Sequence, residues 1–168
     1  AGVTRTSVTD SSAVTIDLTA PTLPLVAIAS SNAADTGRAN EGDTITVTIT
    51  ASEPITLPAV QIAGRAADVS GVGSSWSAAY TVVGADVTEG AASVLVVFED
   101  LASNAGVTQS TTTDASTVEI DLTVPTLPAV SITSDNSNDA TKVNHGDTIT
   151  LSFTSSEDIT TPTVVLAG

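Results

Sequence analysis

The sequence repeats itself at a fixed offset of 104 residues (Ile120 against Ile16), and this repeat constrains the architecture more than any other feature. Residues Ile16–Pro24 read IDLTAPTLP, and Ile120–Pro128 read IDLTVPTLP. Residues 1–64 align without a gap with residues 105–168, and about 36 of the 64 aligned pairs are identical. A period of this length indicates an array of similar domains in one chain.

The offset divides the chain into three parts, which we interpret as successive copies of one repeat. Residues 1–20 are the C-terminal strand of a first copy, residues 21–124 are a complete second copy, and residues 125–168 are the N-terminal part of a third. A domain of about 100 residues buries enough apolar surface to fold by itself, whereas the two flanking parts are too short. We therefore predict one complete domain between two incomplete neighbours.

Acidic residues outnumber basic ones and limit the partners of the chain. The sequence has 19 Asp and Glu against 4 Lys and Arg, a net charge of −15. Repulsion from phosphate groups disfavours nucleic acid and anionic membrane surfaces, while divalent cations are natural counter-ions. We therefore expect no nucleic-acid partner. The sequence has no apolar run long enough for membrane insertion of this segment, and no cysteine for a disulfide.

Alternating apolar and polar residues predict β-strands along the chain. Thr44–Thr50 reads TITVTIT, which places Ile45, Val47 and Ile49 on one face and threonines on the other. The counterpart at residues 148–154 keeps this pattern. No window has the sustained 3.6-residue apolar period of an amphipathic helix. The pattern thus favours an all-β chain.

Turn signals separate seven short strands within the complete repeat. A Gly/Ser turn is expected at Ser70–Ser75, and the apolar run Val94–Phe98 indicates a strand buried on both faces. Seven strands in a domain of this length predict an all-β sandwich. The predicted strands are Val26–Ser30, Thr44–Thr50, Ala59–Ala63, Arg65–Val69, Trp76–Val82, Ala92–Glu99 and a kinked last strand at Val107–Thr112 and Ser116–Asp121.

A series of short motifs adds a resemblance. In chain order they are DLTAP at Asp17–Pro21, GDTITV at Gly42–Val47, SEPI at Ser52–Ile55, Trp76 with YTV at Tyr80–Val82, EG at Glu89–Gly90 and DLASNAG at Asp100–Gly106. Their order resembles the bacterial immunoglobulin-like tandem repeats of giant surface and biofilm adhesins, and the resemblance covers the whole chain. One departure is Ser103, where a glycine is usual; in the third copy His145 and Asp158 replace Glu41 and Pro54.

The resemblance implies a fold, a location and partners. The fold would be a seven-stranded immunoglobulin-like β-sandwich in tandem array, located extracellularly, at the cell surface or secreted. The repeat would be a non-catalytic spacer of the adhesin, often stiffened by calcium between domains. Its partners would be neighbouring repeats of the same chain, with lateral or head-to-tail self-association as a further option.

Acidic residues in the turns indicate calcium at the junctions between repeats. If successive strands alternate in direction, the turns of Glu53, Asp100 and Asn104 lie at one end of the sandwich, beside the linker residue Asp17. Calcium takes about six to eight oxygen ligands, which carboxylates and amide oxygens provide, and a cation relieves the repulsion between crowded carboxylates. The alternative is that all four residues are ordinary solvated or hydrogen-bonded turn residues.

The same reasoning predicts a second calcium site at the next junction. Asp121 is the linker counterpart of Asp17, and Glu157 is the counterpart of Glu53. With Asp158 beside it, Glu157 would converge on Asp121, and an acidic turn residue at Asp86 or Glu89 would join from the preceding repeat. The predicted metal ligands are therefore Asp17, Glu53, Asp100, Asn104, Asp121, Glu157 and Asp158.

Two other motifs each allow a functional and a structural interpretation. Asp135–Asp139 reads DNSND, with alternating oxygen side chains like those of a calcium loop. Its counterpart Ser31–Asp35 lacks two of these side chains, which favours an ordinary turn. Trp76 and Tyr80 could stack on a sugar, but both fall on the inward face of an alternating strand. This favours a place in the core, with the tyrosine hydroxyl reaching the surface.

The residues of an enzyme active site are missing, and we predict that the chain is not an enzyme. His145 is the only histidine, and the complete repeat has Glu41 in its place. Since cysteine is absent as well, neither a nucleophile–base pair nor a zinc site can be assembled. The adjacent Glu99 and Asp100 would point to opposite faces of a strand.

Three functions remain open on these grounds. The first is a stalk or spacer repeat of a long extracellular adhesin, with a short, proline-restricted linker stiffened by calcium. The second is a subunit of a self-assembling extracellular filament, in which residues 1–20 supply a strand to the half-domain 125–168 of another chain. The counterparts of residues 65–104 would still be missing from that half-domain. The third is a ligand-binding tip module, which would need an exposed aromatic residue or an insertion.

Overall fold

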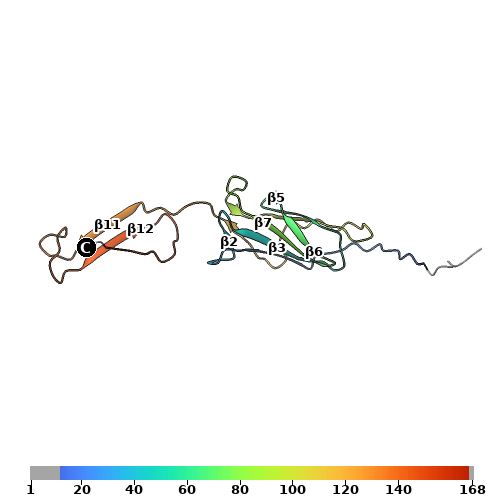
Figure 1. The fold of residues 1–168 in the computed structure, drawn as a ribbon, viewed down its shortest axis with the longest axis horizontal. Helices are drawn as coiled ribbons and strands as arrows, with labels where there is room; N and C mark the ends of the chain where they lie inside the picture. The colour runs from blue at the N-terminus through green and yellow to red at the C-terminus, as the bar shows by residue number, and fades with distance from the viewer. Residues whose placement is uncertain (1–11, 167–168) are drawn as a thin grey trace, which may run out of the picture. The chain divides into compact units, whose positions relative to one another are not determined.

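The chain forms two compact units that consist of strands and loops. The computed structural model describes residues 12–166 (Figure 1). Its contacts divide the chain into unit 1, Ala1–Leu122, and unit 2, Thr123–Gly168. No helix occurs within the described residues, and so none there is long and apolar enough to cross a membrane. The predicted all-β class is confirmed, while the exact repeat boundaries stay a prediction.

The larger sheet of unit 1 has four antiparallel strands in the order β1-β3-β7-β6. These are β1 (Leu25–Ser30), β3 (Thr44–Thr50), β7 (Ser75–Thr81) and β6 (Asp68–Val72). In the centre, Ile45 of β3 lies opposite Tyr80 and Ile49 opposite Trp76 of β7. This register places the apolar side chains of neighbouring strands on the same face.

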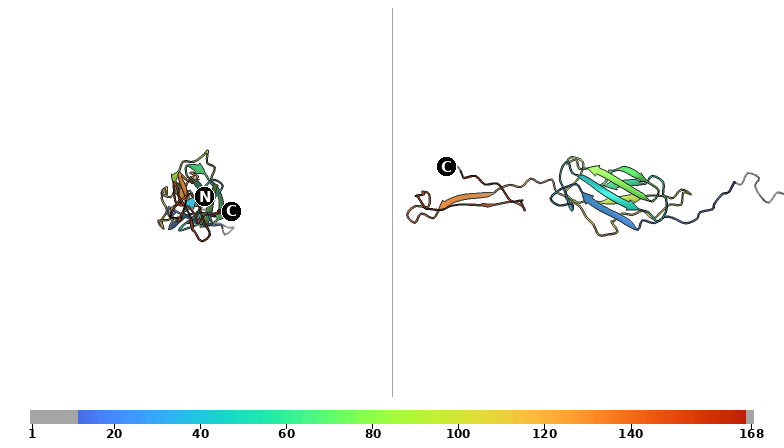
Figure 2. Two further views of the ribbon diagram at one scale, coloured as in Figure 1. Left: turned by 90° about the vertical axis from the view of Figure 1, so that its left-hand side faces the viewer. Right: turned by 60° about the horizontal axis from the view of Figure 1, so that its bottom comes forward.

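Two smaller sheets complete unit 1. One has the order β5-β4-β9, with β5 at Arg65–Ala66, β4 at Ala59–Ile62 and β9 at Val94–Val97. The other has the order β2-β10-β8, with β2 at Arg38–Ala39, β10 at Glu119–Ile120 and β8 at Gly90–Ala91. β10 runs parallel to β2 and antiparallel to β8. The views in Figure 2 show these strands layered around one core.

The core lies between the sheets and follows the predicted alternation. Ile45, Val47 and Ile49 of β3 are at most 1% exposed, and they pack in one cluster with Val60 and Ile62 of β4. Complete removal of such side chains from water contributes roughly 1.5–3 kcal/mol each to stability. The inward face predicted for Thr44–Thr50 is therefore confirmed.

Strand β7 carries Trp76 and Tyr80, and the hydroxyl oxygen of Tyr80 lies elsewhere than the sequence predicts. Trp76 and Tyr80 are half-buried and pack against the core, and the indole Nε1 donates to the backbone oxygen of Gly73 at 3.0 Å. The hydroxyl of Tyr80 is buried and has no hydrogen-bond partner among the described residues. The prediction that this hydroxyl reaches the surface is wrong, because the ring packs against the core and its oxygen atom is covered.

Four predictions about the strands need correction. The predicted strand Arg65–Val69 is two short strands in different sheets, β5 at Arg65–Ala66 and β6 at Asp68–Val72. β9 is fully buried on one face only, since on the other face Leu95 is half-buried and Val97 is 49% exposed. The predicted turn at Ser70–Ser75 begins later, because Val72 still pairs with Ser75. The long last strand shrinks to β10 and a bridge between Gln109 and Val96.

The last strand is short because the segment beside β1 bonds to it through side-chain hydroxyls, where a regular strand would form a continuous ladder of backbone hydrogen bonds. The hydroxyl of Thr113 accepts a hydrogen bond from the backbone nitrogen of Val26 at 2.9 Å. The hydroxyl of Ser116 accepts one from the backbone nitrogen of Ile28 at 2.8 Å. These bonds satisfy backbone donors that a neighbouring strand would otherwise bind.

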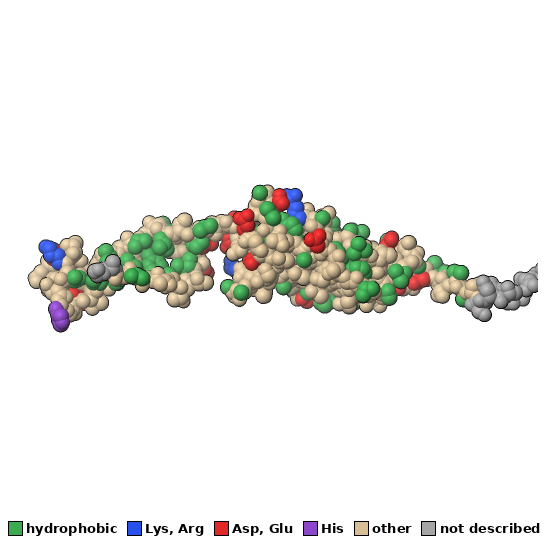
Figure 3. Space-filling model, viewed as in Figure 1, with side chains coloured by type: hydrophobic (Ala, Val, Ile, Leu, Met, Phe, Trp, Pro, Cys, Tyr) green, Lys and Arg blue, Asp and Glu red, His purple; other side chains and the backbone are tan. Residues whose placement is uncertain are grey.

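Unit 2 is a hairpin of β11 (Ala129–Ser134) and β12 (Ile149–Thr154). Its register repeats that of β1 and β3 at the offset of the sequence repeat: Val130 lies opposite Phe153, as Val26 lies opposite Ile49. The surroundings differ, because the partner sheets of unit 1 have no counterpart among the described residues of unit 2. Apolar side chains consequently lie on its surface (Figure 3).

Candidate metal site

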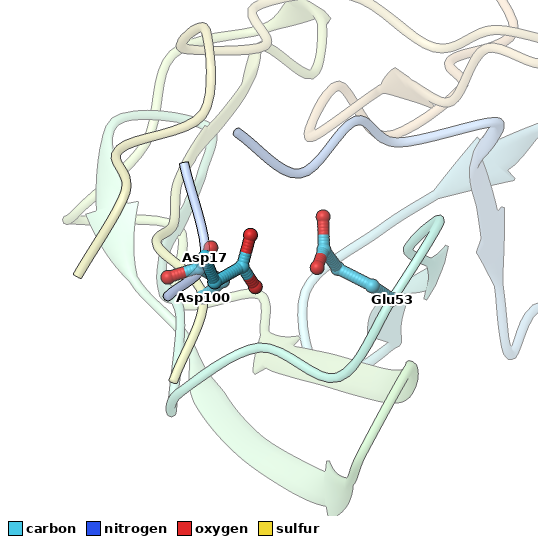
Figure 4. A group of neighbouring side chains, drawn as sticks. All are labelled: Asp17, Glu53 and Asp100. Atoms are coloured by element: carbon cyan, nitrogen blue, oxygen red, sulfur yellow. The ribbon is translucent and has the colours of Figure 1, made fainter. Parts of the chain in front are cut away.

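Three carboxylates from distant parts of unit 1 lie next to one another. Asp17 belongs to the segment that precedes β1, Glu53 to the loop after β3 and Asp100 to the turn after β9. One oxygen atom from each lies within 4.8 Å of the others. Figure 4 shows the three side chains. The structure therefore brings together three of the four residues expected at this junction, and Asn104 joins them as described below.

Asp100 organises the turn that presents it. Its Oδ1 accepts hydrogen bonds from the backbone nitrogens of Ala102 and Asn104, each at 2.8 Å, and the side chain is 1% exposed. Ser103 within the turn has a φ of 66°, in the left-handed region that L residues rarely adopt. A short acceptor side chain at the start of such a turn replaces backbone partners, which explains why an aspartate stands here.

Asn104 connects this turn to the linker. Its Nδ2 donates to Asp100 Oδ2 at 2.7 Å and to the backbone oxygen of Asp17 at 3.2 Å. Both bonds use the amide nitrogen, so the amide oxygen is the atom of Asn104 that suits a cation. The residue thus positions Asp17 over the acidic turn.

Backbone hydrogen bonds also hold the Glu53 loop near the turn. Ile55 forms an antiparallel bridge with Asp100, and the backbone nitrogen of Thr56 donates to the backbone oxygen of Glu99 at 2.9 Å. On the other side, Ser52 exchanges two hydrogen bonds of 2.9 Å with Thr22 of the linker segment. Glu53 lies between these two attachments, which fix its backbone.

The pKa values of Glu53 and Asp100 shift in opposite directions because the surroundings of these two carboxyl groups differ. Burial, followed by the negative charges of Asp17 and Asp100, raises the pKa of Glu53 above its ordinary value. Burial also acts to raise the pKa of Asp100, but hydrogen bonds from Asn104, Ala102 and Ser103 together outweigh it and lower that pKa. Asp100 is thus a stable carboxylate, and the ionised form of Glu53 is disfavoured unless a positive charge comes near.

The donor set fits a hard divalent cation. Three carboxylates and one amide oxygen provide oxygen ligands of the kind that calcium takes. The cluster contains neither histidine nor cysteine, which zinc and copper sites generally require. The hydrogen bonds of Asp100 within its turn explain its position whether or not a cation binds. The turn does not explain why the carboxylate of Glu53 lies close to Asp17 and Asp100.

The residues of the second predicted site fall in different units. Asp121 belongs to unit 1, while Glu157 and Asp158 belong to unit 2, so their convergence stays a prediction. Within unit 2, Glu157 is half-buried and its Oε1 has no hydrogen-bond partner among the described atoms, whereas Asp158 is exposed.

Within unit 1, Asp121 lies beside a basic residue that sequence reasoning missed. Its Oδ2 lies 3.9 Å from Nη1 of Arg38, and both residues line a polar surface pocket of about 500 Å³ with Asp35 and Glu89. Arg38 also lies 3.7 Å from Asp35, an ion pair that recurs between Lys142 and Asp139 in the third copy. This i, i+3 pair was visible in both copies of the sequence. The guanidinium already supplies positive charge at Asp121.

In the DNSND loop, Asp135–Asp139, side-chain oxygens already accept hydrogen bonds from nearby groups of the protein. Oδ1 of Asn136 accepts from the backbone nitrogen of Asn138 at 3.0 Å, and Oδ2 of Asp139 accepts from the ammonium of Lys142 at 2.7 Å. The Lys142 ammonium, with the hydroxyl and backbone nitrogen of Thr141, lowers the pKa of Asp139 to about 2. The second copy makes the same turn at Asn32, which supports the interpretation as an ordinary turn.

Comparisons with known proteins identify no relative. No family model, no curated protein and no solved structure matches the chain. The functional interpretation therefore depends on the repeat and on the geometry described above.

Proposed function

We propose that this chain is a stalk or spacer segment of a long extracellular bacterial surface adhesin, with calcium stiffening the junction between a linker and the following domain. The observation that carries the proposal is the position of Asp17. This linker residue lies with Glu53 and Asp100 of the domain in one group of carboxylate oxygens within 4.8 Å. A cation bound there would tie the linker to the domain.

The arrangement of strands supports an immunoglobulin-like sandwich. In that fold one sheet has the order A-B-E-D and the facing sheet contains C, F and G. The order β1-β3-β7-β6 corresponds to the first sheet, and β4-β9 corresponds to C and F. The bridge from Val96 of β9 to Gln109 lies where strand G would pair. Tandem sandwiches of this type suit an extended spacer with no catalytic role.

The short attachment between repeats supports a restricted hinge. The backbone nitrogens of Asp121 and Leu122 donate to Ala39 and Glu89 within unit 1. The backbone nitrogen of Thr126 donates to Ser156 at 2.9 Å within unit 2, as Thr22 does to Ser52 in unit 1. Between these bonds lies a segment that contains a Val-Pro pair, whose backbone angles are restricted. Such a linker sets the spacing of neighbouring repeats.

Calcium dependence of stability tests the proposal. Thermal unfolding of the chain would be followed with calcium and with EGTA, together with calcium binding by titration calorimetry. A ligand that binds only the folded state raises the unfolding midpoint. We expect a rise of about 5 °C, which corresponds to roughly 1 kcal/mol of stabilisation in a domain of about 100 residues.

Paired variants connect the effect to the site. The double variant Asp17→Asn, Glu53→Gln removes two carboxylates but keeps Asp100 and its turn. The matched control Glu41→Gln, Asp68→Asn removes the same charge at two exposed positions of unit 1. The first variant should lose the calcium response and the control should keep it. A midpoint that does not depend on calcium in the unmodified chain would contradict the proposal and leave a plain spacer.

A further inference from the structure

The linker leaves unit 1 directly from β10, which runs between β2 and β8, and its first two residues continue the hydrogen bonds of that strand. The backbone nitrogen of Asp121 donates to the backbone oxygen of Ala39 at 2.9 Å, on the side of β2. Successive backbone nitrogens of a strand point to opposite sides, so the nitrogen of Leu122 points towards β8. It donates there to Oε1 of Glu89 at 2.9 Å. The linker is therefore attached on both sides beyond the end of β10.

The carboxylate of Glu89 takes the place of a backbone acceptor. The pairing of β10 with β8 ends at Ile120, which lies opposite Gly90, the first residue of β8. Beyond this pair, the nitrogen of Leu122 meets a side-chain oxygen where a longer β8 would offer a backbone oxygen. A hydrogen bond to a charged acceptor is roughly twice as strong as one between neutral groups. Glu89 thus extends the hold of the sheet into the linker.

The side chain of Leu122 adds an apolar contact to this attachment. It is partly buried and packs against the core of unit 1. It also approaches the loop before β8, because its Cδ1 would lie 3.9 Å from a Cβ added to Gly84. A hydrogen bond beside apolar side chains is electrostatically stronger than one surrounded by water. The contact therefore supports the bond between the linker backbone and Glu89.

Arg38 supplies positive charge at the place where the linker leaves. Four carboxylates and one guanidinium line the polar pocket of about 500 Å³: Asp35, Glu89, Glu119, Asp121 and Arg38. The guanidinium lies 3.9 Å from the carboxylate of Asp121 and 3.7 Å from that of Asp35. Without it, repulsion between the carboxylates of Asp121 and Glu89 would oppose the attachment of the linker. The repeat keeps a basic residue here, since two of the four in the sequence, Arg38 and Lys142, occupy this one repeat position.

We propose that Glu89 and Arg38 are positioning residues, which anchor residues 121–122 of the linker to the domain that the linker leaves and need no metal ion for this. Glu89 binds the linker backbone, and Arg38 offsets the repulsion that would release it. The purpose of the anchor rests on the proposed spacer function, because a spacer keeps its length and direction only if the linker is fixed at both ends. Calcium at Asp17 would fix a linker to the domain that it enters, and the anchor fixes it to the domain that it leaves.

Amide hydrogen exchange of the 168-residue chain in EGTA tests the anchor. In Glu89→Ala the amide of Leu122 should exchange about tenfold faster or more, because its hydrogen bond to a charged acceptor is lost. The amide of Ile45 in the core should exchange at its former rate, which shows that the domain stays folded. The matched control Glu119→Ala removes the same charge from the same pocket but keeps the acceptor of Leu122, so it should leave that amide protected.

Two conservative variants separate the hydrogen bond from the charge of Glu89. Glu89→Gln loses the charge but keeps the length of the side chain and an acceptor oxygen, so the amide of Leu122 should keep most of its protection. Glu89→Asp keeps the charge but is one methylene shorter, so it should lose the protection as Glu89→Ala does. The opposite order would show that only the charge of Glu89 matters, and would overturn its assignment as the acceptor that positions the linker.

Variants of Arg38 test the counter-charge. At low salt, Arg38→Gln should speed the exchange of the Leu122 amide several-fold, and NMR relaxation should show larger motion of residues 121–122. Sodium chloride at about 0.5 M should reverse much of this change, because salt screens the repulsion between exposed carboxylates. Arg38→Lys should behave like the unmodified chain.

Two results would overturn the proposal. One is equal exchange of the Leu122 amide in Glu89→Ala and in the control Glu119→Ala, and the other is an Arg38→Gln chain that matches the unmodified one at low salt. All of these measurements are made in EGTA. A missing response to calcium would therefore contradict the proposed metal site and leave the anchor standing, whereas loss of the anchor would leave the calcium response at Asp17 intact.

Discussion

The side-chain amide of Asn104 reaches the backbone oxygen of Asp17 across 87 residues of sequence, with 3.2 Å between nitrogen and oxygen. The same nitrogen donates to Oδ2 of Asp100 at 2.7 Å. One side chain therefore joins the linker to the turn after β9, and the path of the linker past the domain depends on it.

Replacing Asn104 should free the linker. In Asn104→Ala, the loss of two hydrogen bonds, one of them to a carboxylate, should lower the free energy of unfolding by about 1–3 kcal/mol. NMR relaxation should also show larger backbone motion for residues 16–19. The control Asn32→Ala disrupts a turn elsewhere in unit 1 and should leave these linker amides unchanged. Unchanged linker order in Asn104→Ala would contradict the role assigned to the amide.

The stability of metal-free unit 1 should pass through a maximum in mild acid. The pKa of Glu53 lies above its ordinary 4.5, so the stability gained from its protonated form is present at low pH and is lost as the pH rises through that pKa. The pKa of Asp100 lies below its ordinary 3.8, so its contribution is present at higher pH and is lost as the pH falls through that lowered pKa.

Urea unfolding between pH 2 and pH 7 in EGTA measures this dependence. In Glu53→Gln the rise in stability from neutral to mildly acid pH should disappear, while the loss at lower pH should remain. Calcium should remove the same rise in the unmodified chain, because a bound cation favours the ionised carboxylate. An identical pH profile for the variant and the unmodified chain would show that Glu53 does not have the raised pKa.

A glycine at position 103 should stabilise unit 1. Ser103 has a φ of 66°, a region that costs an L residue roughly 1–2 kcal/mol, whereas glycine enters it readily. After subtraction of the larger unfolded-state entropy of glycine, Ser103→Gly should raise the free energy of unfolding by about 0.5–1 kcal/mol. The neighbouring Ala102→Gly, at an ordinary φ, should lower it. Chemical denaturation of both variants tests the sign.

A methyl group at position 106 should be costly. A Cβ on Gly106 would overlap the ring of Phe98, which is 5% exposed. We expect Gly106→Ala to lower the free energy of unfolding by about 1–3 kcal/mol. Gly84→Ala is the control, because its Cβ would come no closer than 3.4 Å to a flexible glutamate side chain. In a Phe98→Leu background the cost should shrink; an undiminished cost would show that the ring is not the cause.

Part of the site followed from the sequence because alternating strands and turns are local signals. The alternation in Thr44–Thr50 predicted β3 with its observed bounds, and alternating strand directions predicted that Asp17, Glu53, Asp100 and Asn104 meet at one end of unit 1. The alternating pattern that the sequence keeps at residues 148–154 likewise corresponds to β12 at Ile149–Thr154.

Other features depended on contacts between distant segments. The run Val94–Phe98 reads as buried on both faces, yet only the tertiary structure shows that one side of β9 is partly open, with Leu95 half-buried and Val97 49% exposed. The short strands β2, β8 and β10 have too few residues for a periodic pattern, and they exist because their partners lie beside them. Arg38 meets Asp121 only after that pairing.

The sequence by itself determined the strand periodicity and the residues of the acidic turns, because these depend on neighbours within a few positions. It also determined the repeat, because segments 104 residues apart share most of their residues. The tertiary structure alone decided exposure. Ile28 and Ile132 are the same residue at the same place in two copies, yet they are 5% and 61% exposed. The physical reason is that burial is a property of what packs against a side chain. Among the described residues, a strand from far along the sequence covers the first of the two and none covers the second.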